Sequence, residues 1–190
     1  WDEKGRTARE RGKIFHAIRE KETIESFGGK YGYESTEDSN IRIALDMKNL
    51  VNKVYAELII PYPKGMLIGT ADRVKFTPSG FHIRDYKTNE EIKFVGDAYY
   101  NKEKGYKEVK KMLSPVGHLD YTKGTIYTLQ LSLYSYFLES WGYKHLSSTI
   151  DHAIFEKRNG VDHLVEIREY PVPYLKKEVE SIIKLLQLKK

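Results

Sequence analysis

The chain contains no cysteine. Disulfide bonds, thiolate nucleophiles, zinc–thiolate sites and cysteine-ligated iron–sulfur clusters are therefore excluded. Long apolar runs are also missing, and none approaches the roughly 20 residues that a membrane-spanning helix needs. The sequence has no Gly-x-x-x-x-Gly-Lys-Ser/Thr phosphate loop, so no nucleotide-driven motor lies within these residues.

Charge and aromatic content are the more informative positive features. The 32 Lys and Arg exceed the 27 Asp and Glu, which gives a net charge of +5 and suits a polyanionic partner. The 15 tyrosines include residues able to stack on unpaired bases, although most are expected at the edges of the core. A length of 190 residues predicts one domain that spans 1–190.

Hydrophobic periodicity predicts a mixture of helices and strands. Turn signals at 61–65 and 77–80 separate three strands closely enough to favour an antiparallel meander. Between the third strand and the next helix, residues 89–123 form a lysine-rich stretch that is too long for a simple connection and indicates an insertion or flap. The predicted helices are 2–24, 41–54, 125–141 and 174–188, and the predicted strands are 54–60, 66–76, 81–86, 146–156 and 164–170. The fold class is therefore α/β (α+β).

The sharpest local feature is Asp85-Tyr86-Lys87 at the end of the third predicted strand. Alternate residues of a strand share a face, so the carboxylate and the ammonium emerge side by side. Asp72 lies on the preceding strand, and a hairpin can bring it close to both. Two carboxylates near a lysine are costly to assemble unless a cation offsets their repulsion. This geometry predicts a divalent metal site or, alternatively, a surface cluster of ion pairs.

An ordered series of motifs resembles the RecB-like branch of the PD-(D/E)XK nuclease superfamily. Gly12-x-x-x-His16, Gly69-x-x-Asp72, Asp85-x-Lys87 and Gln130-x-x-x-Tyr134 follow one another as they do in that family. The match covers roughly residues 11–139. The sequence around Gln130 is most similar to the phage and mitochondrial exonucleases of this group. The resemblance implies a restriction-endonuclease-like core, with a central mixed sheet led by the three-strand meander and flanked by helices.

The resemblance also implies a role for each matched residue. Asp72 and Asp85 would bind the metal together with His16 and the carbonyl of Tyr86, and Lys87 would position the attacking water. Imidazole suits transition metals, so Mn²⁺ is expected beside Mg²⁺. Further supporting or substrate-binding roles are expected for Glu57, Arg73, Gln130, Tyr134, Lys102, Lys104 and Lys107. The pairs Asp151-His152, Asp162-His163 and His118 with Asp120 lie outside the pattern and are expected in turns or on the surface.

The implied activity is metal-dependent hydrolysis of DNA phosphodiesters, as an exonuclease on single strands or duplex ends in recombination, repair or replication. DNA and proteins of replication or recombination would be the partners, without a membrane. The expected location is the cytoplasm of a bacterium or phage-infected host, with mitochondria as the alternative if a targeting segment has been removed. Three other readings stay open: an inactive DNA-binding module of the same fold, a structure-specific endonuclease, and an unrelated metal-binding α/β protein.

Overall fold

A five-stranded mixed sheet forms the centre of the computed structural model, which describes residues 3–26, 34–35, 42–43, 50 and 54–187. The strand order is β3-β4-β5-β8-β9, and only β5 and β8 run parallel within it. The sheet strands are β3 (Val54–Tyr62), β4 (Leu67–Thr77), β5 (Gly80–Lys87), β8 (His145–Arg158) and β9 (Val161–Val172). The α/β prediction and the antiparallel meander of β3, β4 and β5 are thereby confirmed.

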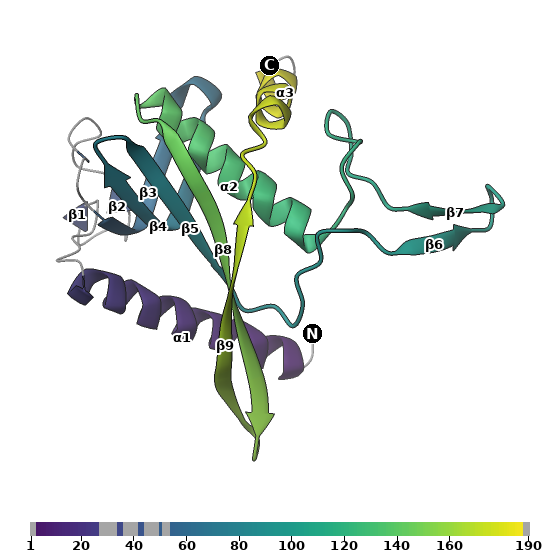
Figure 1. Cartoon of the computed structure of the whole chain (residues 1–190), viewed down its shortest axis with the longest axis horizontal. Coiled ribbons are helices and arrows are strands. Elements are labelled where there is room, and N and C mark those ends of the chain that lie inside the picture. The colour runs from purple at the N-terminus through teal and green to yellow at the C-terminus, as the bar shows by residue number, and fades with distance from the viewer. Residues whose placement is uncertain (1–2, 27–33, 36–41, 44–49, 51–53, 188–190) are drawn as a thin grey trace.

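Three α-helices in the described part of the chain accompany the sheet (Figure 1): α1 (Glu3–Ser26), α2 (Lys123–Ser140) and α3 (Lys176–Gln187). The α2 helix belongs to the crossover that a parallel pair of strands requires. Thr122 is its N-cap residue, whose side chain accepts a hydrogen bond from the Thr125 amide, and the helix ends before Gly142, which has φ +97. None of these helices is long and apolar enough to cross a membrane.

The two faces of the sheet bury different clusters. One face packs on α2 and α3 through the main core, which includes Leu58, Val74, Ile83 and Leu131. The other face packs on α1 through a small cluster of Phe15, Tyr86 and Ala153. Since successive side chains of β5 alternate in direction, Ile83 joins the main core while Tyr86 joins the α1 cluster.

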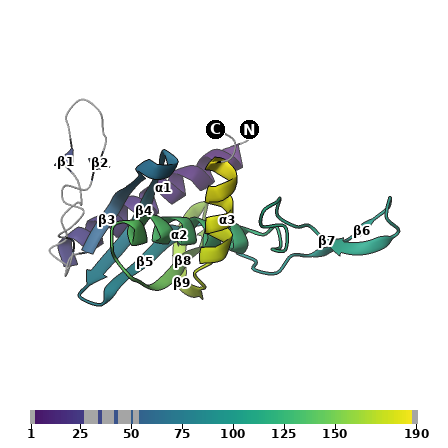
Figure 2. The ribbon, with the colours of Figure 1, turned by 90° about the horizontal axis from the view of Figure 1, so that it is seen from above.

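The stretch from 89 to 123 contains a hairpin of β6 (Ala98–Asn101) and β7 (Tyr106–Val109). Figures 1 and 2 both show this hairpin projecting well away from the sheet and helices. The remaining elements are the short pair β1 (Glu34–Ser35) and β2 (Arg42–Ile43) and the 3-10 turn η1 (Pro63–Gly65). An insertion or flap was expected at 89–123. The hairpin in it is a projecting arm and does not pack as a layer on the sheet.

Two sequence-based expectations need correction. Arg42–Ile43 is a strand and not part of a helix, because tertiary pairing with β1 overrides the helical periodicity; most of the predicted helix 41–54 lies outside the described residues. Asp151 and His152 are not turn or surface residues but lie buried in β8, at 1% and 3% exposure. On α1, whose helix was predicted, the apolar side chains of Ile14 and Ile18 are 62% and 50% exposed.

Candidate active site

The candidate site lies where β4 and β5 separate. Their hydrogen-bonded register ends at Arg73 opposite Arg84, and the next residue on each strand is Asp72 and Asp85. Beyond this point a side chain links the two strands in place of the backbone: Oδ2 of Asp72 accepts a hydrogen bond of 2.5 Å from the Tyr86 amide. The splayed strand ends therefore hold two carboxylates close together in the protein interior, where they are 8% and 2% exposed.

Glu57 reaches the same place from β3 through an unusual backbone conformation. It sits between the pairs Ala56–Arg73 and Leu58–Ala71, directly opposite Asp72. Its φ of +48 lies in the left-handed region, which is rare for a residue other than glycine and costs free energy. Strain of this kind at a charged side chain is typical of functional sites.

His16 completes the group from α1. Its Nε2 donates to the Tyr86 carbonyl at 3.1 Å, while Nδ1 lies 3.6 Å from Asp72 Oδ1 and 3.9 Å from Glu57 Oε1. The Phe15 and His16 rings both meet the Tyr86 ring edge to face, which fixes α1 against β5. At Gly12, a Cβ would lie 3.2 Å from Thr88 Oγ1, so a small residue suits this close approach.

Metal-ligand geometry follows from these contacts. One ligand atom each from His16, Glu57 and Asp72 lies within 4.8 Å of the others, close enough for one cation to bind all three. Carboxylate oxygens with one imidazole suit Mn²⁺ or another divalent ion of similar character. These residues therefore fit a divalent metal ion, and Asp85 and the Tyr86 carbonyl border the same space.

Asp85 and Lys87 form an ion pair on β5, as the Asp-x-Lys spacing predicted. The Lys87 ammonium also lies 4.6 Å from the centre of the Tyr127 ring on α2. Tyr127 in turn donates a hydrogen bond of 2.6 Å to Asn89 Oδ1. Neither Tyr127 nor Asn89 was predicted, because only the packing of α2 onto the end of β5 brings them to Lys87.

Burial sets the electrostatics of the carboxylates. Desolvation, followed by repulsion from Asp85, raises the pKa of Asp72 to about 7. Desolvation also raises the pKa of Asp85, although attraction to Lys87 opposes it. A bound cation would favour the charged forms of both residues, so this arrangement is more favourable with a metal than without one.

The pKa values of the two basic groups, His16 and Lys87, are also raised, which favours their charged forms. The interaction with Glu57, helped by the charge of Asp72, outweighs burial and raises the pKa of His16. Burial alone would lower the pKa of Lys87, but attraction to Asp85 and Asp72 together raises it. Lys87 is therefore a stable cation at neutral pH, suited to orienting water or neutralising phosphate and not to acting as a base.

Gln130 and Tyr134 lie one turn apart on α2 and are joined by a hydrogen bond of 2.9 Å from Gln130 Nε2 to the Tyr134 hydroxyl. The Tyr134 ring packs directly on the backbone of Gly69, where a Cβ would lie only 2.3 Å from the ring. Glycine at the start of Gly-x-x-Asp therefore lets α2 contact β4, and this pair braces the strand that carries Asp72.

Other predicted residues lie elsewhere. Lys102, Lys104 and Lys107 belong to the projecting hairpin, away from the carboxylates (Figure 1). Arg73 lines a separate pocket together with Arg84. The structure thus brings together His16, Glu57, Asp72, Tyr86, Asp85 and Lys87, with Gln130 and Tyr134 as a brace.

Comparison of the chain with protein family models, curated proteins and solved structures finds no match to any of them.

Proposed function

We propose that the chain is a metal-dependent deoxyribonuclease of the PD-(D/E)XK type, similar to the RecB-like branch. One observation carries the proposal: residues from three separate segments, His16, Glu57 and Asp72, converge within 4.8 Å beside the Asp85–Lys87 pair. A surface cluster of ion pairs does not account for this, because Asp72 and Asp85 are buried and their pKa values are raised.

A restriction-endonuclease-like core is part of the same proposal. Support comes from the antiparallel meander followed by a helical crossover to a parallel strand, with the carboxylates at the point where β4 and β5 separate. Helices on both faces supply further side chains, His16 from α1 and Gln130 from α2. Fold alone does not establish activity, so the proposal depends on the site.

In this proposal Asp72, Asp85, His16 and the Tyr86 carbonyl would hold Mg²⁺ or Mn²⁺, and Glu57 would bind the ion or its water shell. The ion, when bound, would lower the pKa of a water and stabilise the charge that develops on the scissile phosphate. Lys87 orients the attacking water through its fixed ammonium, which Asp85 and the Tyr127 ring hold in place. Tyr134 and Gln130 keep β4 in register by packing on Gly69.

The β6–β7 hairpin is the element proposed to hold single-stranded DNA. Tyr99, Tyr100 and Tyr106 are 47%, 58% and 53% exposed, which makes them available for stacking on bases. Lys102 and Lys107 are exposed beside them and suit contacts with backbone phosphates. Lys104 is less available, since its ammonium lies 2.7 Å from Glu108 Oε2.

The test is cleavage of 5′- and 3′-labelled single- and double-stranded DNA with Mg²⁺, Mn²⁺ or EDTA. The matched variants are Asp85→Asn at the site and Asp97→Asn on the surface, where the Asp97 side chain is 80% exposed. We expect metal-dependent cleavage that Asp85→Asn abolishes and Asp97→Asn retains. The product ladder would separate exonuclease from endonuclease action. If the protein binds DNA but does not cleave it with any metal, the enzyme proposal is wrong and the chain is an inactive DNA-binding module.

A further inference from the structure

The backbone that leaves β5 is held by side chains from two distant elements. The register of β5 with β8 ends at Lys87 opposite His152, so the carbonyl groups that follow lie beyond this pairing. The Thr88 carbonyl accepts a hydrogen bond of 3.2 Å from Arg11 of α1. The Asn89 carbonyl accepts one of 2.7 Å from His152 of β8. Two successive carbonyl groups are therefore satisfied by side chains where the strand pairing has ended.

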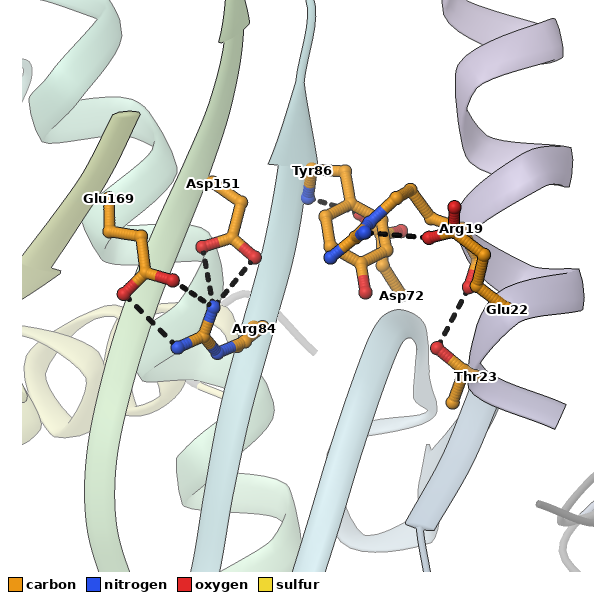
Figure 3. A network of polar contacts seen from close by, with 8 residues as sticks. All are labelled: Arg19, Glu22, Thr23, Asp72, Arg84, Tyr86, Asp151 and Glu169. Atoms are coloured by element: carbon orange, nitrogen blue, oxygen red, sulfur yellow. Dashed lines mark hydrogen bonds and ion pairs between the residues drawn. The ribbon is translucent and has the colours of Figure 1, made fainter. Parts of the chain in front are cut away.

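His152 meets Asn89 from the face of β8 that packs toward α2. The residues on either side of it, Asp151 and Ala153, point to the α1 face, where Arg84 holds Asp151 at 3.0 Å (Figure 3). A carbonyl only accepts hydrogen bonds, so Nε2 of His152 carries a hydrogen. The ring is 3% exposed, and within the described residues its Nδ1 has no hydrogen-bond partner. A buried polar atom without a partner costs free energy, which indicates that the contact with Asn89 is what a histidine contributes here.

The side chain of Asn89 reaches α2. Its Oδ1 accepts a hydrogen bond of 2.6 Å from the Tyr127 hydroxyl group, and the centre of the Tyr127 ring lies 4.6 Å from Lys87 Nζ. A cation over the face of an aromatic ring is attracted by that ring. Tyr127 therefore contacts the ammonium with its ring and the Asn89 amide with its hydroxyl group. Rotation of the ring away from Lys87 would break the hydrogen bond, so Asn89 determines where the ring meets the ammonium.

The segment after β5 also packs against the start of α2. The Gly124 amide donates a hydrogen bond of 2.8 Å to the Lys93 carbonyl. A Cβ at Gly124 would lie only 2.5 Å from the Phe94 ring, so the two segments are in close contact. Tyr127 lies one turn after Gly124 on α2, and Asn89 lies on the segment that α2 contacts. The hydrogen bond between them therefore joins two backbones that other contacts already hold together.

We propose that Asn89 is a positioning residue, which holds the Tyr127 ring against the ammonium of Lys87. His152 supports it by fixing its backbone. The ammonium is contacted from two elements, by Asp85 on β5 and by the Tyr127 ring on α2. A cation held in one place orients a water or a phosphate oxygen better than a mobile one. The consequence for cleavage rests on the proposed function, whereas the positioning of the ammonium depends only on these contacts.

The first measurement is single-turnover cleavage, with metal saturating and the protein in saturating excess over labelled DNA. Asn89→Ala removes the acceptor, Tyr127→Phe removes the donor but retains the ring, and a double variant carries both changes. We expect each single variant to cleave about tenfold more slowly, and the double variant no more slowly than either. The matched control is Tyr174→Phe, since the Tyr174 hydroxyl group donates a 2.9 Å hydrogen bond to Glu139 in the last turn of α2. This control should cleave at the wild-type rate.

The second measurement follows the ε-protons of Lys87 by NMR in EDTA without DNA, so it depends on neither metal nor cleavage. An aromatic ring shields protons that lie over its face, so these signals should lie upfield of those of the exposed Lys64. Tyr127→Leu lacks the ring and gives the unshielded reference. Asn89→Ala should move the signals toward that reference. Asn89→Asp retains an acceptor oxygen and should keep the signals near their wild-type position.

The outcomes distinguish this proposal from the nuclease proposal. If the Lys87 signals do not move in Asn89→Ala, or if the effects of the two substitutions on cleavage add, Asn89 does not position the ammonium. A loss of DNA affinity in EDTA that is confined to Asn89→Ala would also overturn the proposal, because Asn89 would then be a DNA contact. If the wild type cleaves nothing, the nuclease proposal fails, and the NMR measurement alone confirms or overturns the positioning of Lys87.

Discussion

Two carboxylate–lysine pairs of this protein behave in opposite ways. Asp85 and Lys87 pair at the end of β5 with side chains 2% and 15% exposed, whereas Glu108 and Lys104 pair on the projecting hairpin with side chains 20% and 52% exposed. Burial raises the pKa of Asp85 despite the adjacent ammonium. On the hairpin, hydrogen bonds from Lys104, Asn101 and Tyr99 lower the pKa of Glu108 to about 2.

The comparison shows that contact with solvent, and not the identity of the partners, decides whether the ionised form of the carboxylate in such a pair is favoured. The free-energy penalty of removing two charges from water exceeds the gain from their mutual attraction unless additional hydrogen bonds or charges stabilise them. The hairpin pair stays in contact with water and gains from its hydrogen bonds. A fold that retains the costly buried pair therefore has a use for it, and metal binding beside Asp72 is the use that the geometry supports.

Breaking the buried pair should have the largest effect. In the proposed mechanism Lys87→Ala removes the ammonium that would orient water and offset phosphate charge, so we expect single-turnover cleavage to slow by about 10²–10⁴-fold. Lys104→Ala, the equivalent change on the hairpin, should leave the chemical step within a few-fold of wild type. Measuring both variants at saturating Mg²⁺, with the protein in saturating excess over the labelled DNA, separates chemistry from DNA affinity. A Lys87→Ala rate within tenfold of wild type would remove Lys87 from the mechanism.

Asp72→Asn should reveal the cost of the buried carboxylate. The pKa of Asp72 is raised to about 7 in the folded state, so the folded protein binds more protons here than the unfolded chain between about pH 4 and 7. Its contribution to the free energy of unfolding is therefore lost as pH rises through that window, by a few kcal/mol in the absence of metal. Asn cannot ionise and avoids this loss.

Urea unfolding in EDTA at pH 4.5 and pH 8 measures this effect. We expect the two proteins to be similar at pH 4.5 and Asp72→Asn to be the more stable at pH 8. Added Mn²⁺ should stabilise the wild type and not the variant, because only the wild type retains the ligand. A variant that is less stable at pH 8 in EDTA would show that the carboxylate is compensated by the protein alone.

Substitution of Glu57 tests the strained strand opposite Asp72. Glycine adopts a φ of +48 without the penalty of a side chain, so Glu57→Gly should be about 1 kcal/mol more stable than Glu57→Ala. In an ordinary strand the order would be reversed, because glycine weakens strands. Thermal unfolding of the two variants in EDTA gives the sign directly. Both variants should bind Mn²⁺ more weakly than the wild type, since both lack the carboxylate.

The smallest effect belongs to the hairpin pair. Lys104→Ala should leave the urea midpoint unchanged within error, since exposed ion pairs contribute little to stability. The pKa of Glu108 should nevertheless rise from about 2 toward its ordinary value, because Lys104 provides the largest of its stabilising contacts. An NMR titration of the Glu108 carboxyl group measures this. A drop in stability similar to that of a core variant would show that the hairpin pair is not solvated as described.

Local patterns predicted much of this fold. The turn residues at 77–80 and the alternation of β5 led to the correct hairpin, where Gly80 adopts φ +144 close to the Lys144 carbonyl. The prediction at 41–43 was wrong because a periodic apolar pattern does not record tertiary pairing. Asp151 and His152 were misplaced for a related reason: their burial depends on Arg84 and on the Asn89 carbonyl, far away in the sequence.

The sequence by itself determined which residues are candidates for the chemistry: the spacing of Asp85-x-Lys87 puts both side chains on one face of a strand, and Gly12-x-x-x-His16 lies on one helix. Only the tertiary structure decided that His16, Glu57 and Asp72 share one space, and that Arg73 and Arg84 line another. The physical reason is that periodicity fixes side-chain direction within one element. The distance between elements, and the burial that sets each pKa, arises only when α1, the sheet and α2 pack together.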